Sequence, residues 1–91
     1  MGKKTILIVD DNADTRLVLS ARLKANHYHT IFAADALQAI CVARKEQPDA
    51  ILLDLGLPGG NGMMVLERLK ANTCLSGIPV IIVTADDPLV A

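Results

Sequence analysis

The chain has 91 residues, of which 52% are hydrophobic, and its nine basic and ten acidic residues leave a formal net charge of -1 at pH 7. A chain of this length predicts one domain, residues 1–91, which buries somewhat over roughly 60% of its unfolded surface. A nucleic-acid-binding surface would need a stripe of Lys and Arg that this sequence does not contain. The apolar runs are short and broken by charges, so we expect no membrane span, no signal peptide and a cytoplasmic location.

The first predicted strand covers residues 5–9, a β-branched and leucine run that is typical of the centre of a sheet. Asp10 and Asp11 close this strand, and either Asp11 or Asn12 can cap the helix that follows. The helix is expected to end near Asn26. Its core-facing stripe is expected to consist of apolar positions at Leu17, Val18, Ala21 and Leu23 to Ala25.

A weaker and more polar strand follows at residues 28–33, and it suits the edge of a sheet. Asp35 caps the second predicted helix, which stops before Pro48. The apolar positions of this helix are Leu37, Ile40, Cys41 and Ala43. Cys41 and Cys74 lie far apart without a Cys-x-x-Cys pattern, which predicts buried or half-buried free thiols in a reducing compartment.

The third strand is the short apolar run of residues 50–53. A fully buried strand cannot hold an unpaired charge at low cost, so Asp54 is expected at its exit. A rigid loop from Leu55 to Asn61 follows, in which Pro58 fixes one backbone angle. The glycines of this stretch permit close approach and positive φ angles near the carboxylate, and they are Gly56, Gly59, Gly60 and Gly62. The third helix is predicted from Met63 to Ala71, with its two methionines as core filler.

The fourth strand, residues 80–83, is a continuous apolar run that ends in Thr84. The alternation of strands and helices predicts a parallel sheet with right-handed crossovers and with helices on both faces. If the first strand is central and the order is 2-1-3-4, Asp10, Asp11 and Asp54 meet in one crevice at the carboxyl ends of the strands. Thr84 would border that crevice from the other side.

Three carboxylates in one crevice repel one another, so such a site either raises a pKa or binds a hard cation through oxygen ligands. Mg2+ suits the set, because it tolerates two or so carboxylates, keeps several waters and can hold a phosphoryl oxygen. Asp54 can then act as a nucleophile for phosphoryl transfer, with the Thr84 hydroxyl bonding the transferred group. Taken singly, these residues have simpler roles: Asp10 and Asp11 as a strand end and helix cap, and Asp54 as a loop-capping carboxylate.

Three segments of the sequence together resemble the receiver domain of two-component response regulators: Ile6 to Asn12, Leu52 to Gly62, and Pro79 to Ala85. The resemblance implies a flavodoxin-like, three-layer α/β/α fold with a parallel sheet in the order 2-1-3-4. It also implies that the chain acts as the phosphoacceptor module of a phosphorelay. Its expected partner is a sensor histidine kinase or a phosphotransfer protein. The chain is expected to be no enzyme beyond its own phosphorylation and dephosphorylation.

The resemblance further implies roles for individual residues. Asp54 resembles the phosphoacceptor. Asp10 and Asp11 resemble the acidic pair that binds Mg2+ together with Asp54, and the backbone carbonyl of Gly56 resembles a further ligand of the metal. Thr84 resembles the switch hydroxyl. Ala85 resembles the small residue that leaves the phosphoryl pocket open.

The chain is expected to cover about three quarters of the family's fold, without a fourth helix, a fifth strand and a fifth helix. The missing part would carry the lysine that pairs with the phosphoryl group in the family. A phosphorylation-impaired pseudo-receiver that serves as an interaction module is therefore an alternative function. A phosphatase with an aspartyl nucleophile ranks last, because the segment after Asp54 lacks a second acid two residues on. The open edge of the fourth strand predicts self-association or docking of a complementary fragment.

Overall fold

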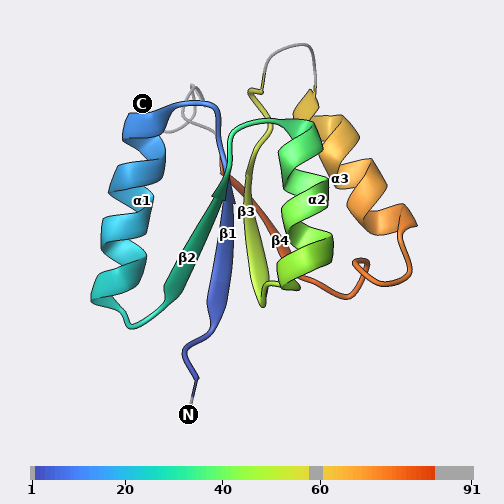
Figure 1. Ribbon diagram of the computed structural model, residues 1–91. Coiled ribbons are helices and arrows are strands. Elements are labelled where there is room, and N and C mark those ends of the chain that lie inside the picture. The colour runs from blue at the N-terminus through green and yellow to red at the C-terminus, as the bar shows by residue number, and fades with distance from the viewer. Residues whose placement is uncertain (1, 58–60, 84–91) are drawn as a thin grey trace.

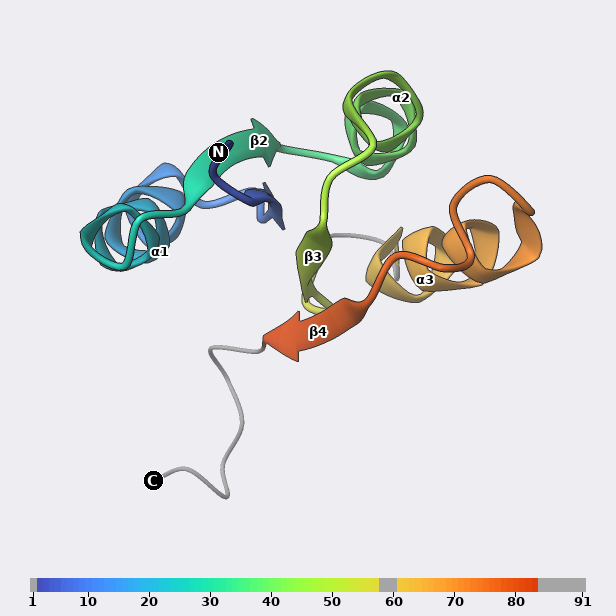
Figure 2. The same cartoon turned by 90° about the horizontal axis from the view of Figure 1, so that it is seen from below.

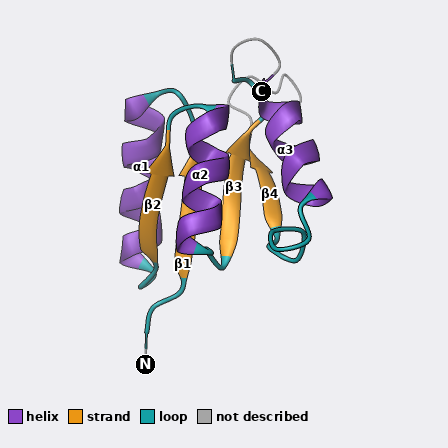
Figure 3. Ribbon diagram, turned by 45° about the vertical axis from the view of Figure 1, so that its right-hand side comes forward, coloured by secondary structure: helices purple, strands orange, loops and turns teal. Residues whose placement is uncertain are grey.

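Four parallel strands form one sheet in the computed structural model, which describes residues 2–57 and 61–83. The strands are β1 (Thr5–Val9), β2 (His29–Ala33), β3 (Ala50–Asp54) and β4 (Val80–Val83). Their order is β2-β1-β3-β4, and each neighbouring pair is parallel (Figure 3). The predicted strand order and the edge position of the second strand are therefore confirmed.

Helices cover both faces of this sheet in the described part of the chain. They are α1 (Ala13–Ala25), α2 (Ala36–Glu46) and α3 (Asn61–Ala71). Seen along the strands, α1 lies on one face, and α2 and α3 lie together on the other (Figure 2). This is the three-layer α/β/α arrangement of a flavodoxin-like fold. None of these described helices has the length and apolarity that crossing a bilayer requires.

Two helices begin at a side chain that bonds the free amides of their first turn. Asn12 caps α1, and its Oδ1 accepts hydrogen bonds from the amides of Asp14 at 2.8 Å and Thr15 at 3.1 Å. Asp35 caps α2, with a bond of 2.8 Å from the amide of Gln38 to its Oδ1. Both helices therefore start within a few residues of the strand that precedes them, so the strand ends and the helix starts share one edge of the molecule (Figure 1).

The main core lies between the sheet and the pair of helices α2 and α3. Leu7, Ile51 and Leu53 are fully buried on this face of the sheet, where they belong to one cluster with Val65 and Leu69 of α3. Burial of a side chain of this size contributes on the order of 1.5–3 kcal/mol. This packing fixes the ends of β1 and β3, which lie next to polar residues.

α1 packs on the opposite face, but through a different side from the predicted one. Leu17 and Val18 are 69% and 56% exposed, whereas Ser20 is buried. Ser20 can face the sheet because its hydroxyl shares a hydrogen bond of 2.9 Å with the hydroxyl of Thr30. The exposed members of the predicted stripe are Leu17, Val18, Ala21, Lys24 and Ala25. That prediction is wrong because the helix is apolar on more than one side, and the sheet takes the side that carries Ser20.

Exposed residues on α2, α3 and the turn after α3 correct further expectations. Leu37 is 77% exposed, and Met63 and Met64 are 49% and 37% exposed, so the methionines are not core filler. Cys41 and Cys74 are free thiols as predicted, but both are exposed. The residues that α2 does bury are Ala36, Ala39 and Ala43. Small alanines let this helix approach the sheet closely, while Ile40 and Val42 pack partly buried beside them and Leu37 remains exposed.

Candidate functional site

Three aspartates meet at the carboxyl end of the sheet. Asp10 and Asp11 directly follow β1, and Asp54 is the last residue of the neighbouring strand β3. A carboxylate oxygen from each lies within 4.8 Å of those from the other two. Parallel neighbouring strands place their carboxyl ends side by side, and this brings together residues that are far apart in the sequence. The predicted convergence of Asp10, Asp11 and Asp54 is confirmed.

Asp10 is the buried member of this cluster, with 5% of its surface exposed. The amide of Asn12 donates to its Oδ1 at 2.9 Å. Burial raises the pKa of the Asp10 carboxyl, and the bond from Asn12 opposes this. The charges of Asp54 and Asp11 raise the pKa further, while Arg16 lowers it. A cation bound beside Asp10 would offset this cost of its charged form.

Asp54 is half-buried, and its own loop holds one of its two carboxylate oxygens. The amide of Gly56 donates to Oδ1 of Asp54 at 2.8 Å, while Oδ2 accepts no hydrogen bond from the described residues. A Cβ atom at position 56 would lie 3.1 Å from Oδ1, tighter than ordinary contact. Gly56 thus lies beside the carboxylate, as predicted, and it leaves Oδ2 available for chemistry.

The glycine at the start of α3 fixes the backbone that follows Asp54. A Cβ atom at Gly62 would lie 2.8 Å from the backbone oxygen of Asp54 and 2.5 Å from the Cα of Leu55. Atoms cannot approach this closely, so only glycine permits the helix to start here. The predicted close approach of a glycine to this segment is confirmed at Gly62. Residues 58–60 of the predicted loop lie outside the described residues.

Arg16 is a residue of the site that the sequence pattern did not single out. Its Nη1 donates to the backbone oxygen of Asp10 at 2.6 Å. The signal was present in the sequence, because Arg16 lies on the first full turn of a helix that begins just after a strand. Side chains on a helix tilt toward its N-terminus, so an arginine at this position can reach back to the strand end.

The donor set suits a hard divalent cation in its chemistry. All three donors are carboxylate oxygens, which Mg2+ prefers. In an octahedral Mg2+ site with bonds of roughly 2.1 Å, neighbouring ligands lie about 3 Å apart and opposite ligands about 4.2 Å apart. The oxygens of Asp10, Asp11 and Asp54 lie within 4.8 Å of one another, so they surround one common point without matching this spacing. These residues could hold the ion directly or through its waters.

Two predicted site residues, Thr84 and Ala85, lie outside the described residues, so their roles stay predictions. The last described residue of β4 is Val83, and it is the register partner of Asp54 on β3. β4 therefore ends beside the aspartate cluster, at the same edge of the sheet.

Comparison with known proteins reveals a family match and close relatives. The sequence matches the response regulator receiver domain over residues 6–90. It is 41% identical over 85 residues to Sporulation initiation phosphotransferase F of Bacillus subtilis, covering 93% of this chain and 67% of that protein. It is 38% identical over 82 residues to Protein PilH of Pseudomonas aeruginosa, covering 90% of this chain and 68% of that protein. The chain spans only 35% of DNA-binding response regulator MtrA of Mycobacterium tuberculosis, to which it is 39% identical.

Solved structures with the same fold include the N-terminal domain of a response regulator receiver protein from Methanoculleus marisnigri. That structure superposes with a TM-score of 0.86 at 31% identity, covering 93% of this chain and 71% of the other. Chemotaxis protein CheY4 of Vibrio cholerae gives a TM-score of 0.86 at 25% identity, with 97% and 74% coverage. The predicted receiver-type fold is confirmed.

Proposed function

The chain belongs to the response regulator receiver family, and we propose that it accepts a phosphoryl group on Asp54. The donor is a phosphohistidine of a sensor histidine kinase or of a phosphotransfer protein. The observation that supports this most is the cluster of Asp10, Asp11 and Asp54, with carboxylate oxygens within 4.8 Å of one another. The family match over residues 6–90 includes all three.

Asp54 is the nucleophile in this proposal. The amide of Gly56 holds Oδ1, so Oδ2 is the oxygen that attacks phosphorus. The bond between phosphorus and the donor histidine nitrogen breaks as the bond from Oδ2 to phosphorus forms, and the nitrogen keeps the electron pair. The product is an acyl phosphate on Asp54.

Asp10, Asp11, Asp54 and the backbone carbonyl of Gly56 are the residues that would hold Mg2+. Bound there, the ion would supply the positive charge that offsets the charge on the phosphoryl oxygens. Arg16 bonds the backbone of Asp10 and so keeps the end of β1 in position for this role. We keep Thr84 as the proposed switch hydroxyl and Ala85 as the proposed opening of the phosphoryl pocket.

An interaction module that self-associates is the second candidate function, and one observation favours it. β4 is an edge strand of the described sheet, and Ile81 and Ile82 are 52% and 41% exposed. Exposed apolar side chains on a strand with open backbone groups promote pairing with another chain. A second copy could pair through this edge and form a symmetric dimer. In this candidate, phosphorylation of Asp54 is impaired or absent.

Acetyl phosphate tests the main proposal, since it is a small phosphoryl donor that needs no partner protein. With Mg2+ present, the intact mass of the wild type is expected to increase by one phosphoryl group. Asp54→Asn should show no increase, while Glu67→Gln, at an exposed position of α3, should behave as wild type. A folded wild type that stays unmodified favours the interaction module. Hydrolysis of p-nitrophenyl phosphate, which we do not expect, would indicate a phosphatase.

A further inference from the structure

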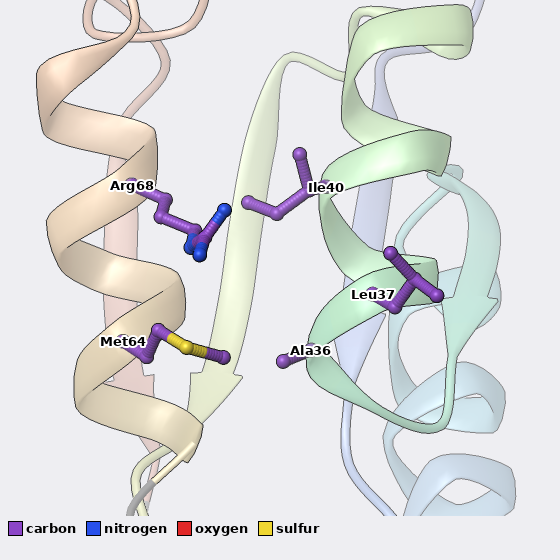
Figure 4. A pocket seen from close by; sticks show the side chains of 5 residues that line it. All are labelled: Ala36, Leu37, Ile40, Met64 and Arg68. Carbon is purple, nitrogen blue, oxygen red and sulfur yellow. The ribbon is translucent and has the colours of Figure 1, made fainter.

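A groove lies between α2 and α3, on the side of the molecule away from α1 (Figures 2 and 4). One part of the groove is lined by Ala36, Leu37, Ile40, Met64 and Arg68, of which Arg68 lies in the last turn of α3. Met64 and Arg68 extend from α3 toward α2, and Ala36 and Ile40 lie opposite them (Figure 4). Four of the five lining residues are apolar, so this end of the groove offers an apolar surface to a partner.

The groove continues toward the C-terminal ends of the helices, where its character becomes basic. The lining there consists of Ile40, Arg44, Arg68, Ala71 and Asn72. Ile40 and Arg68 belong to both parts, which makes the two parts one continuous surface. Arg44 also lines a neighbouring hollow together with Cys41 and Lys45. None of the described residues that line these hollows is acidic, so the lining is positively charged.

The apolar end of the groove carries exposed side chains that do not pack in the core of the described chain. Leu37 is 77% exposed and Met64 is 37% exposed, although α2 and α3 bury enough small and branched side chains to pack against the sheet. Methionine is flexible and polarizable, so its side chain adapts to different apolar partners. An exposed leucine and methionine beside two arginines form a surface that is apolar at one end and positively charged at the other.

We propose that this groove binds an acidic, amphipathic helical segment of a partner protein. The apolar side chains of the segment would pack on Leu37, Ile40 and Met64, and its carboxylates would pair with Arg44 and Arg68. Arginine suits this role because its planar guanidinium can donate two parallel hydrogen bonds to one carboxylate. The charge of the groove selects the partner: a basic segment is repelled, and a purely apolar one leaves the arginines unpaired.

The spacing of the lining residues sets the pattern of the segment. Ala36 and Arg44 are eight residues apart on α2, which corresponds to about 12 Å at 1.5 Å per residue. A partner helix that lies along the groove covers the same distance in eight residues. Its apolar residues at positions i and i+4 and its acids at i+7 and i+8 then lie on one face. This surface does not include the aspartate cluster.

A designed peptide tests the proposal by NMR titration of the isotope-labelled chain. The peptide has about 15 residues, with Leu at i and i+4 and Glu at i+7 and i+8. We expect amide shifts confined to α2 and α3, and a dissociation constant that rises with salt. The double variant Arg44→Glu with Arg68→Glu should weaken binding by at least about tenfold.

The matched control reverses two charges at the end of a different helix. Arg22→Glu with Lys24→Glu makes the same change in the last turn of α1, and it should leave the dissociation constant within about twofold of the wild type. A second variant, Leu37→Asn, tests the apolar end at an exposed position where folding is not at risk, and it should weaken binding severalfold.

Several outcomes would overturn the proposal. They are shifts that map to α1 or β4, equal binding of a peptide with Lys in place of Glu, and unchanged affinity in the double variant. Binding of the chain to anionic phosphatidylglycerol vesicles without binding of the peptide would indicate a membrane surface instead of a protein partner. A concentration-dependent dimer that the double variant disrupts, again without peptide binding, would identify a second copy of the chain as the occupant.

Discussion

A Cβ atom at Gly62 would lie 2.5 Å from the Cα of Leu55, so the first turn of α3 lies directly against the backbone that follows Asp54. This contact ties the loop after Asp54 to the first turn of α3. The position of the Asp54 carboxylate depends on α3 as well as on its own strand.

Gly62→Ala is expected to destabilise the protein by about 1–3 kcal/mol, the usual cost of overpacking a close contact. Alanine ordinarily favours a helix over glycine by roughly 0.5–1 kcal/mol, so a loss of stability identifies the contact as the cause. Urea unfolding monitored by circular dichroism measures the free energy of unfolding of each protein. The control is Gly77→Ala, because a Cβ atom there meets nothing within 4 Å. Equal stability of Gly62→Ala and the wild type would contradict the described contact.

Mg2+ is expected to bind weakly, and binding should depend on Asp11. Titration with Mg2+ followed by amide NMR should shift residues 10–12 and 54–56 in the wild type, and these shifts should be lost in Asp11→Ala. The control is Asp14→Ala, which removes the same charge in the first turn of α1 but outside the cluster. If Asp11→Ala and the wild type respond alike, the assignment of the metal site is wrong.

Asp10→Asn is expected to raise the stability of the metal-free protein at neutral pH. Burial raises the pKa of the Asp10 carboxyl above its ordinary value, so the charged form is less favourable in the folded state than in the unfolded state. As pH falls through the raised pKa, the folded wild type takes up a proton first and gains stability relative to the variant. The advantage of Asp10→Asn should therefore shrink on acidification and disappear below the unfolded pKa. Urea unfolding at a series of pH values, with a chelator present, measures this.

With Mg2+ added at neutral pH, the wild type should become more stable than Asp10→Asn. A ligand that binds only the folded state stabilises it by an amount that grows with its concentration. The wild type should gain stability with Mg2+, and Asp10→Asn, which lacks one of the three carboxylates, should gain much less. Parallel gains in both proteins would show that Asp10 does not contribute to the metal site.

The second candidate function, an interaction module, predicts self-association through β4 at low micromolar concentration. Ile81→Lys places a charge on the exposed edge strand and should shift the chain toward a monomer. Val18→Lys is the matched control, because Val18 is exposed to a similar extent but lies on α1. Light scattering behind size exclusion gives the molar mass of each. A well-folded wild-type monomer with cooperative unfolding would exclude this mode of association.

The sequence pattern predicted the order of strands and helices along the chain, and the resemblance to receiver domains implied the 2-1-3-4 order of the strands in the sheet. Strand runs such as residues 5–9 are short, β-branched and closed by charge, and this pattern does not depend on what packs around them. The aspartates follow strands that lie side by side in the 2-1-3-4 order, so knowing the order was enough to place them together. Capping of α1 was left open between two residues, and the structure assigns it to Asn12.

Which side of each helix faces the sheet depends on tertiary packing, and the sequence pattern did not predict it. α1 and α2 are apolar on more than one side, and periodicity does not distinguish these sides. Close approach to the sheet selected small residues, Ser20 on α1 and Ala39 on α2, and it left Leu17 and Leu37 exposed. The hydrogen bond from Arg16 to Asp10 and the groove between α2 and α3 likewise depend on how neighbouring elements are placed. The distance between two side chains on different elements is set by packing, which a linear pattern does not contain.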